Sequence, residues 1–191
     1  MYSNIPSLVL GFHGCDRETA RKIITDPTCL LHPSKNSYDW LGNGMYFWEN
    51  SPQRAIEWAQ KSKKIKNPYA LGAIIDLGNC LNLTDIKHAL FLEETYKTIK
   101  KSFDITGKPY PENTEYKRDL DCIVINAVDC TTEKEGLPKY DSVRSPFIEG
   151  KPVYPNAGFF KKSHIQICIR NPNCIKGYFN VRNADEKFDI P

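Results

Sequence analysis

Two short motifs in the first fifty residues contain residue types that can bind a ligand. In the first, residues 11–14 read Gly-Phe-His-Gly, so His13 stands at the end of an apolar run and is followed by a glycine whose bare backbone a ligand can approach. In the second, residues 38–48, aromatic side chains surround Gly42 and Gly44. Each motif alone also fits an ordinary structural role, as a backbone-bonding histidine or an aromatic core strand. Together, in this order and spacing, they are a stronger sign of a ligand-binding site than either motif alone.

A third motif lies in residues 163–170, where polar residues alternate with isoleucine. In a strand this alternation puts His164, Gln166, Cys168 and Arg170 on one face and the three isoleucines on the other. The amide of Gln166 can hold a hydroxyl group, but it carries no charge and cannot act as a base.

Taken in order along the chain, the motifs resemble the catalytic domain of the poly(ADP-ribose) polymerase-like ADP-ribosyltransferases. That family carries His-Gly on one strand and Gly-x-Gly-x-Tyr-Phe on the next, which residues 13–14 and 42–47 match. The third member of its triad precedes a later hydrophobic residue by nine positions, a spacing that Gln166 and Ile175 reproduce (175 − 166 = 9). The resemblance covers the first sixty residues or so well and the last thirty or so moderately. No motif tests residues 70–162.

The resemblance implies NAD as the substrate, no metal, and the triad His13, Tyr46 and Gln166. His13 would hydrogen-bond a ribose hydroxyl, the backbone of Gly14 would hold the carboxamide, and Tyr46 would stack on the nicotinamide ring. The adenosine and pyrophosphate would lie along three loop residues, Ser34, Asn36 and Tyr38.

Two departures from the family pattern matter. Arg54 stands where many members have a serine that contacts the carboxamide, and an arginine there suits a pyrophosphate. Gln166 replaces the usual glutamate, and losing such an electrostatic contact costs on the order of 10² to 10³ in rate. Glu149, in the segment before the third strand, is the candidate for a relocated carboxylate. Loss of the triad glutamate goes with transfer of single ADP-ribose units in related enzymes, so the sequence predicts a mono-ADP-ribosyltransferase.

Other functions stay open. The missing carboxylate also fits a catalytically inert module that binds NAD or ADP-ribose, and water as the acceptor would make the protein an NAD glycohydrolase. A cysteine hydrolase built on Cys15 and His164 lacks an evident orienting group. Lysine clusters and abundant aromatics favour a nucleic-acid acceptor, RNA before DNA, over protein. Small transferases of this class act as toxins or antiphage effectors, so a neutralising antitoxin protein is a further expected partner.

The elements that must position these residues follow from periodicity and capping. We expect strands near residues 7–13, 45–48, 70–77, 80–83, 143–148, 163–170 and 175–181. Helices are expected after Asp16, after Ser51-Pro52, after Asp85 and around residues 120–128. This mixture predicts an α+β fold, and the resemblance implies two small, mainly antiparallel sheets with the NAD cleft between them and helices packed outside.

Composition agrees with a single globular domain over residues 1–191. Apolar residues make up 40% of the chain, and the formal net charge is only +3, which does not by itself indicate nucleic-acid binding. No apolar run is long enough to span a membrane, and no signal peptide is evident. Seven cysteines, an odd number without a Cys-x-x-Cys pair, predict reduced thiols and a cytoplasmic protein that contacts no membrane.

Overall fold

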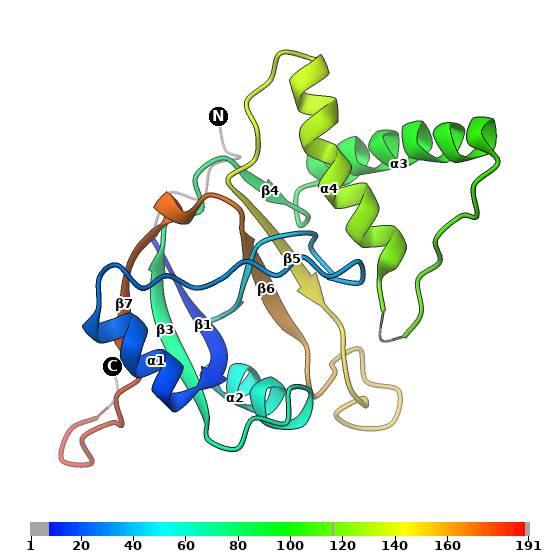
Figure 1. Cartoon of the computed structure of the whole chain (residues 1–191). Helices are drawn as coiled ribbons and strands as arrows, with labels where there is room; N and C mark the ends of the chain where they lie inside the picture. The colour runs from blue at the N-terminus through cyan, green and yellow to red at the C-terminus, as the bar shows by residue number, and fades with distance from the viewer. Residues whose placement is uncertain (1–7, 116, 190–191) are drawn as a thin grey trace.

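The computed structural model describes residues 8–115 and 117–189, and within them the chain forms an α+β fold of seven strands and four α-helices (Figure 1). The strands are β1 (Val9–Asp16), β2 (Met45–Glu49), β3 (Pro68–Ile75), β4 (Cys80–Asn82), β5 (Ser142–Phe147), β6 (His164–Ile169) and β7 (Ile175–Asn180). The helices are α1 (Arg17–Thr25), α2 (Pro52–Lys61), α3 (Ile86–Thr106) and α4 (Asp119–Lys134).

All seven strands belong to one sheet, in the order β4-β5-β6-β2-β1-β3-β7. Neighbouring strands are antiparallel except β4 and β5, which are parallel. The expectation of two separate sheets is therefore wrong, because β1 and β2 join the halves. That junction is narrow: β1 pairs with β2 only at Gly11↔Glu49 and Phe12↔Trp48, whereas its ladder with β3 continues to Asp16.

The two faces of the sheet bury different helices. On one face, which we call the α1 face, Phe47, Leu71 and Ile167 pack with residues of α1. On the opposite face, the α2/α4 face, α4 covers Cys168 together with part of β4 and β5. α2 covers Phe12 and Trp48 on this same face. The alternation predicted for residues 163–170 is confirmed, since Cys168 and Ile167 belong to opposite faces.

Local signals in the sequence explain where the first helices begin. Asp16 is the N-cap of α1, and its carboxylate accepts a hydrogen bond from the backbone N–H of Glu18 at 2.9 Å, as predicted. α2 begins at Pro52, also as predicted, but the Ser51 side chain makes no capping hydrogen bond. The first strand continues past His13 to Asp16, and position 7 of the expected strand lies outside the described residues.

The aperiodic segment between α1 and β2 crosses from the α1 side of the molecule to α4 (Figure 1). Ser34 pairs with Gly44 by two backbone hydrogen bonds, of 2.8 and 3.1 Å. The backbone N–H of Asn43 donates to the side-chain oxygen of Asn126 at 2.8 Å. This segment is therefore held at both β2 and α4.

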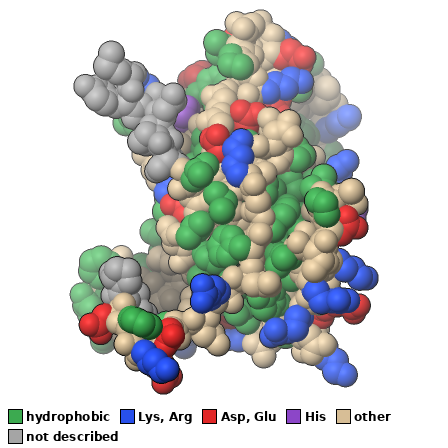
Figure 2. All heavy atoms as spheres, turned by 90° about the vertical axis from the view of Figure 1, so that its left-hand side faces the viewer, with side chains coloured by type: hydrophobic (Ala, Val, Ile, Leu, Met, Phe, Trp, Pro, Cys, Tyr) green, Lys and Arg blue, Asp and Glu red, His purple; other side chains and the backbone are tan. Residues whose placement is uncertain are grey.

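β7 forms one edge of the sheet, on the side of the molecule that Figure 2 shows, where hydrophobic side chains gather in the middle of the face. All seven cysteines are free thiols, in agreement with the sequence. Among the described residues, no helix is both long and apolar enough to cross a membrane.

Candidate functional site

The strand order places the three predicted triad positions on three adjacent strands. Gln166 lies on β6, Tyr46 on β2 and His13 on β1, and β2 is the central strand of the three. Trp48 is directly opposite Gln166, so Tyr46 and Gln166 are diagonal neighbours on the same face of the sheet. Residues 13, 46 and 166, which are far apart in the sequence, thus lie on adjacent strands in the middle of the sheet, Tyr46 and Gln166 on the α2/α4 face and His13, whose ring contacts Phe47, on the α1 face.

The imidazole of His13 bridges the point where β1 and β2 separate. Their ladder ends at Phe12↔Trp48, and beyond it Nδ1 of His13 lies 2.8 Å from the carbonyl oxygen of Tyr46. A carbonyl oxygen can only accept, so Nδ1 carries the proton and Nε2 keeps a free lone pair. Burial lowers the pKa of His13 below its ordinary value, which favours this neutral form. His13 can therefore accept a hydrogen bond from a ligand hydroxyl.

The backbone of Gly14 faces the same gap. The carbonyl of Leu10 accepts from the backbone N–H of Asn50 at 2.9 Å, so even-numbered residues of β1 direct their backbone polar groups toward β2. By this alternation the N–H and C=O of Gly14 point to the β2 side beyond the end of the ladder. A Cβ at Gly14 would clash with the backbone carbonyl of Ala55 in α2, which explains why glycine stands here.

Tyr46 contributes its ring, because its hydroxyl is already engaged. The hydroxyl donates to the carbonyl of Gly42 at 2.7 Å and accepts from the backbone N–H of Leu41 at 2.8 Å. Burial raises the pKa of Tyr46 well above its usual range, so the phenol is no acid or base near neutral pH. Tyr46 anchors the segment before β2, and only its ring is free for ligand contact.

Gln166 is half-buried on the α2/α4 face, with Trp48 of β2 on one side and Ser145 of β5 on the other. Among the described residues its side-chain amide has no hydrogen-bond partner in the protein. The amide is thus available to a ligand beside Tyr46.

Arg54 and Glu149 meet each other rather than the triad. The guanidinium of Arg54 contacts the carboxylates of both Glu57 and Glu149. Its terminal nitrogens are therefore held by acidic partners, and the pyrophosphate contact of Arg54 stays a prediction. Glu149 also lies 3.6 Å from Nδ1 of His164, two residues along β6 from Gln166. Glu149 thus reaches the neighbourhood of the third strand, and its carboxylate lies between Arg54 and His164.

The three loop residues lie toward α4. The Asn36 amide donates to the Ser34 hydroxyl at 2.9 Å, and Ser34 pairs with Gly44 next to β2. Tyr38 is more exposed, and the ammonium of Lys117 lies 5.9 Å from its ring centre. Ser34 therefore lies next to β2, while Tyr38 lies beside the residues that lead into α4.

Two cavities lie on the α2/α4 side of the sheet, and the sequence analysis predicted neither. The larger, about 510 Å³, lies between the segment before β2, α3, α4 and β5, with mainly apolar walls that include Trp40, Leu41 and Phe147. The smaller, about 440 Å³, lies beside the end of β2 and also touches Phe147. His13, Tyr46 and Gln166 line neither cavity. An aromatic residue at the end of an alternating strand, as Phe147 is, was the signal available in the sequence.

The thiols do not form a nucleophilic site. Cys15 packs on the α1 face, whereas His164 stacks on Phe147 on the opposite face, so the pair required for a cysteine hydrolase is separated by the sheet. Burial raises the pKa of Cys15 to about 11 and that of Cys168 to about 12, which keeps both protonated. Among the described residues no cluster of three or more His, Cys, Asp or Glu side chains could hold a metal ion.

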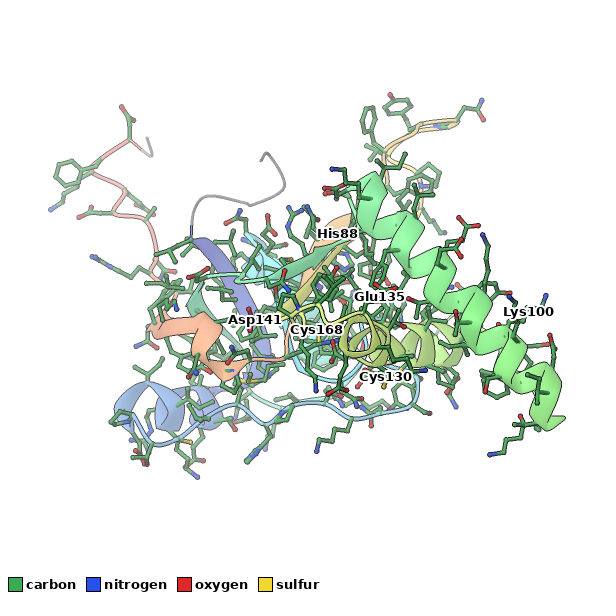
Figure 3. All side chains as sticks on the ribbon, turned by 90° about the horizontal axis from the view of Figure 1, so that it is seen from above. His88, Lys100, Cys130, Glu135, Asp141 and Cys168 are labelled. Atoms are coloured by element: carbon green, nitrogen blue, oxygen red, sulfur yellow. The ribbon has the colours of Figure 1, made fainter. Side chains whose placement is uncertain are left out.

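Three lysines of the clusters noted in the sequence, Lys61, Lys100 and Lys162, lie on separate elements. Lys61 and Lys162 both pair with Glu57, at 3.0 and 2.6 Å. Lys100 lies on the part of α3 that extends away from the sheet, whereas Cys168 lies in the interior (Figure 3). Lys100 therefore does not share one continuous basic patch with Lys61 and Lys162.

No protein-family model matches this chain, and no solved structure matches it. The chain is similar to the uncharacterized protein MJ0359 of Methanocaldococcus jannaschii, with 27% identity over 204 residues. The similarity covers 94% of this chain and 91% of that protein, so it is not confined to one motif. Because that protein is itself uncharacterized, the similarity assigns no activity.

Proposed function

We propose that the protein is a mono-ADP-ribosyltransferase, which cleaves NAD between nicotinamide and ribose and transfers one ADP-ribose unit to a macromolecular acceptor. The gap between β1 and β2 carries this proposal. There the ladder stops, His13 binds the carbonyl of Tyr46, and the backbone of Gly14 faces an unpaired side. We further propose that the two halves of the sheet on either side of this gap correspond to the two sheets of the ADP-ribosyltransferase fold.

The gap suits a carboxamide. A nicotinamide amide presents one carbonyl acceptor and an N–H donor, which complement the N–H and C=O of a single strand residue such as Gly14. Tyr46 offers a ring nearby, and aromatic pairs add about 0.5–1.5 kcal/mol beyond the area they bury. The nicotinamide would therefore bind partly as a strand partner and partly by stacking.

The ribose would lie at the gap between β1 and β2, which His13 lines from the α1 face and across which the ligand would reach Gln166 on the α2/α4 face. The free Nε2 lone pair of neutral His13 accepts from a hydroxyl, and the unpartnered amide of Gln166 can hold another. Bond cleavage places positive charge on the sugar, and this site offers it oriented dipoles without a carboxylate. Because Gln166 carries no negative charge, we expect the transfer of single ADP-ribose units to be slow.

The acceptor that we favour is nucleic acid, RNA before DNA, over protein. Exposed aromatic and basic side chains of the loop between β5 and β6 support this preference. In the same proposal the protein is a toxin or antiphage effector, neutralised by a partner protein.

The test is nicotinamide release from labelled NAD by the purified protein, with and without cell lysate. We expect release, and we expect label in the macromolecular fraction that nuclease removes and protease does not. His13→Ala should lower release by about 10²-fold, because the ribose loses an oriented partner. His32→Ala is the matched control, since His32 is exposed in the segment before β2.

Different outcomes separate the candidate functions. Free ADP-ribose without labelled polymer would identify an NAD glycohydrolase. NAD binding without nicotinamide release would identify an inert binding module. Equal rates for wild type and His13→Ala would reject the site altogether.

A further inference from the structure

The smaller cavity, of about 440 Å³, carries a second set of polar groups that the triad does not use. Residues 49–51, 146–148 and 163–165 line it, so its walls come from the end of β2, the end of β5 and the start of β6. Ser51 and Ser163 supply hydroxyls, while Phe147 and Ile148 supply an apolar side. Such a mixed lining suits a ligand with a polar and a flat apolar part.

His164 is the buried polar side chain of this cavity. Its side chain is 1% exposed, and Nδ1 lies 2.7 Å from the carbonyl oxygen of Lys162, so Nδ1 carries the proton. Nε2 is buried and has no hydrogen-bond partner among the described residues. Burial lowers the pKa of His164, with Arg54 lowering it further and Glu149 opposing both. The unpaired Nε2 is therefore a lone pair that an O–H or N–H donor would satisfy.

The N-terminus of α2 opens at the same cavity. Ser51 lines the cavity as the N-cap residue, and its hydroxyl makes no capping hydrogen bond. Pro52 has no N–H, but the next amides of the first turn are free donors, and the helix dipole adds partial positive charge there, so this end favours a phosphate. The cavity thus places the N-terminus of α2, which can bind a phosphate, beside Nε2 of His164, which can bind a hydroxyl or amine.

The loop between β5 and β6 adds a surface for nucleic acid next to the cavity. It folds back on itself through the pairing of Pro152 with Phe160 and projects beyond the end of the sheet (Figure 1). Tyr154 and Phe159 are 58% and 70% exposed in this loop. Lys151 and Lys161 are exposed beside them, and neither has an ion pair among the described residues. Exposed rings with nearby cations are the elements of single-strand binding, in which bases stack on the rings.

We propose that this cavity is the acceptor site of the transferase, that it takes a nucleotide of a nucleic-acid strand, and that Nε2 of His164 receives the proton of the attacking hydroxyl or amino group. The proposal rests on the proposed NAD chemistry. His164 and Gln166 share one face of β6 and lie two residues apart, about 7 Å along the strand. The acceptor would therefore reach the ribose from the side opposite β1.

The proposed step balances as a displacement. The lone pair of the acceptor oxygen or nitrogen forms a bond to C1′ of the nicotinamide ribose. The C1′–N bond breaks, and its electron pair goes to nicotinamide, which leaves as a neutral molecule. The acceptor's proton passes to Nε2 of His164 and then to water, while the carboxylate of Glu149, 3.6 Å from Nδ1, stabilises the transient imidazolium.

The test compares two reactions of wild type, His164→Gln and the control His32→Gln. One reaction is nicotinamide release in water. The other is transfer of label from NAD to a single-stranded RNA oligonucleotide or to DNA of the same sequence. We expect His164→Gln to lower transfer to nucleic acid by about 10²-fold, since general-base contributions have this size, and to lower release in water by a smaller factor, because the cavity does not hold water as it holds a nucleotide. Labelling of the RNA alone would identify a ribose hydroxyl as the nucleophile. Labelling of both the RNA and the DNA oligonucleotide would identify a base amine.

Two results would overturn the acceptor site: transfer to nucleic acid that His164→Gln leaves intact, or label found on protein alone. A binding measurement keeps the inference testable even if wild type releases no nicotinamide, a result that would reject the proposed function instead. The double variant Tyr154→Ala/Phe159→Ala should weaken binding of a labelled RNA oligonucleotide about tenfold or more, because each stacked base contributes on the order of 1–3 kcal/mol. Unchanged binding would argue that this loop and cavity do not meet nucleic acid.

Discussion

Gln166 decides how fast the proposed site can work. Its amide lies beside Tyr46 and offers hydrogen bonds without charge, at the position where a carboxylate would oppose the positive ribose. We predict that Gln166→Glu raises the rate of nicotinamide release by about 10²-fold, in line with the size of such electrostatic contacts. Steady-state nicotinamide release measures the change, with Gln166→Ala as the companion variant. A slower Gln166→Glu enzyme would mean that another group already supplies the charge.

Burial of His13 makes the stability of the fold depend on pH. Burial lowers the pKa of His13 below its ordinary 6.5, so the unfolded chain binds a proton more readily than the folded one. The contribution of neutral His13 to the free energy of unfolding is complete above about pH 6.5. It is lost as the pH falls below that value, by at most about 1.4 kcal/mol per pH unit for one group. His13→Gln should flatten this dependence between about pH 5 and 6.5 in urea unfolding.

Glu57 does not affect the stability between about pH 5 and 6.5. Its contacts with Lys162 and Lys61 lower its pKa to about 2, so its contribution to stability is lost only as the pH falls below its ordinary pKa of 4.5. His32→Gln is the control for the pH series, and a slope that His13→Gln leaves unchanged would show that His13 is not the responsible group.

The contact between β1 and α2 shows why glycine follows the histidine. A Cβ at position 14 would meet the backbone of Ala55, which can move only if the whole helix moves. We predict that Gly14→Ala destabilises the fold by about 1–3 kcal/mol, the usual cost of overpacking. Gly158→Ala is a matched control, because a Cβ there meets nothing within 4 Å. Chemical unfolding would give both values, and equal stabilities would contradict the close contact.

Helix starts and the two faces of β6 were the parts of the fold that the sequence predicted best. Asp16, Pro52 and the alternation of residues 163–170 each act within a few residues, through a capping bond, a fixed φ or a strand period. What such signals do not contain is which strands become neighbours. The single sheet, joined by only two residue pairs between β1 and β2, therefore differs from the expected pair of sheets.

At the scale of the whole molecule, α3 is the most weakly integrated helix. Along its 21 residues only Thr95 is buried, and Ile86 and Ile105 are 72% and 85% exposed. Elements with little burial open locally, so we predict opening free energies for α3 amides at least about 2 kcal/mol below those of β1 and β3. Native-state hydrogen exchange measures this difference. Protection of α3 equal to that of the central strands would show that α3 opens only with global unfolding.

The sequence by itself determined the kinds of residue at the site, the elements that carry them and the faces of β6, because these depend on periods and caps within short stretches. Only the tertiary structure decided which residues meet. It brought His13, Tyr46 and Gln166 onto adjacent strands, and it joined Arg54 to Glu149 across 95 positions of sequence. Contacts between residues so distant in the sequence depend on the register of long-range strand pairs and on the pairing of half-buried charges. No pattern within a short stretch of sequence specifies either.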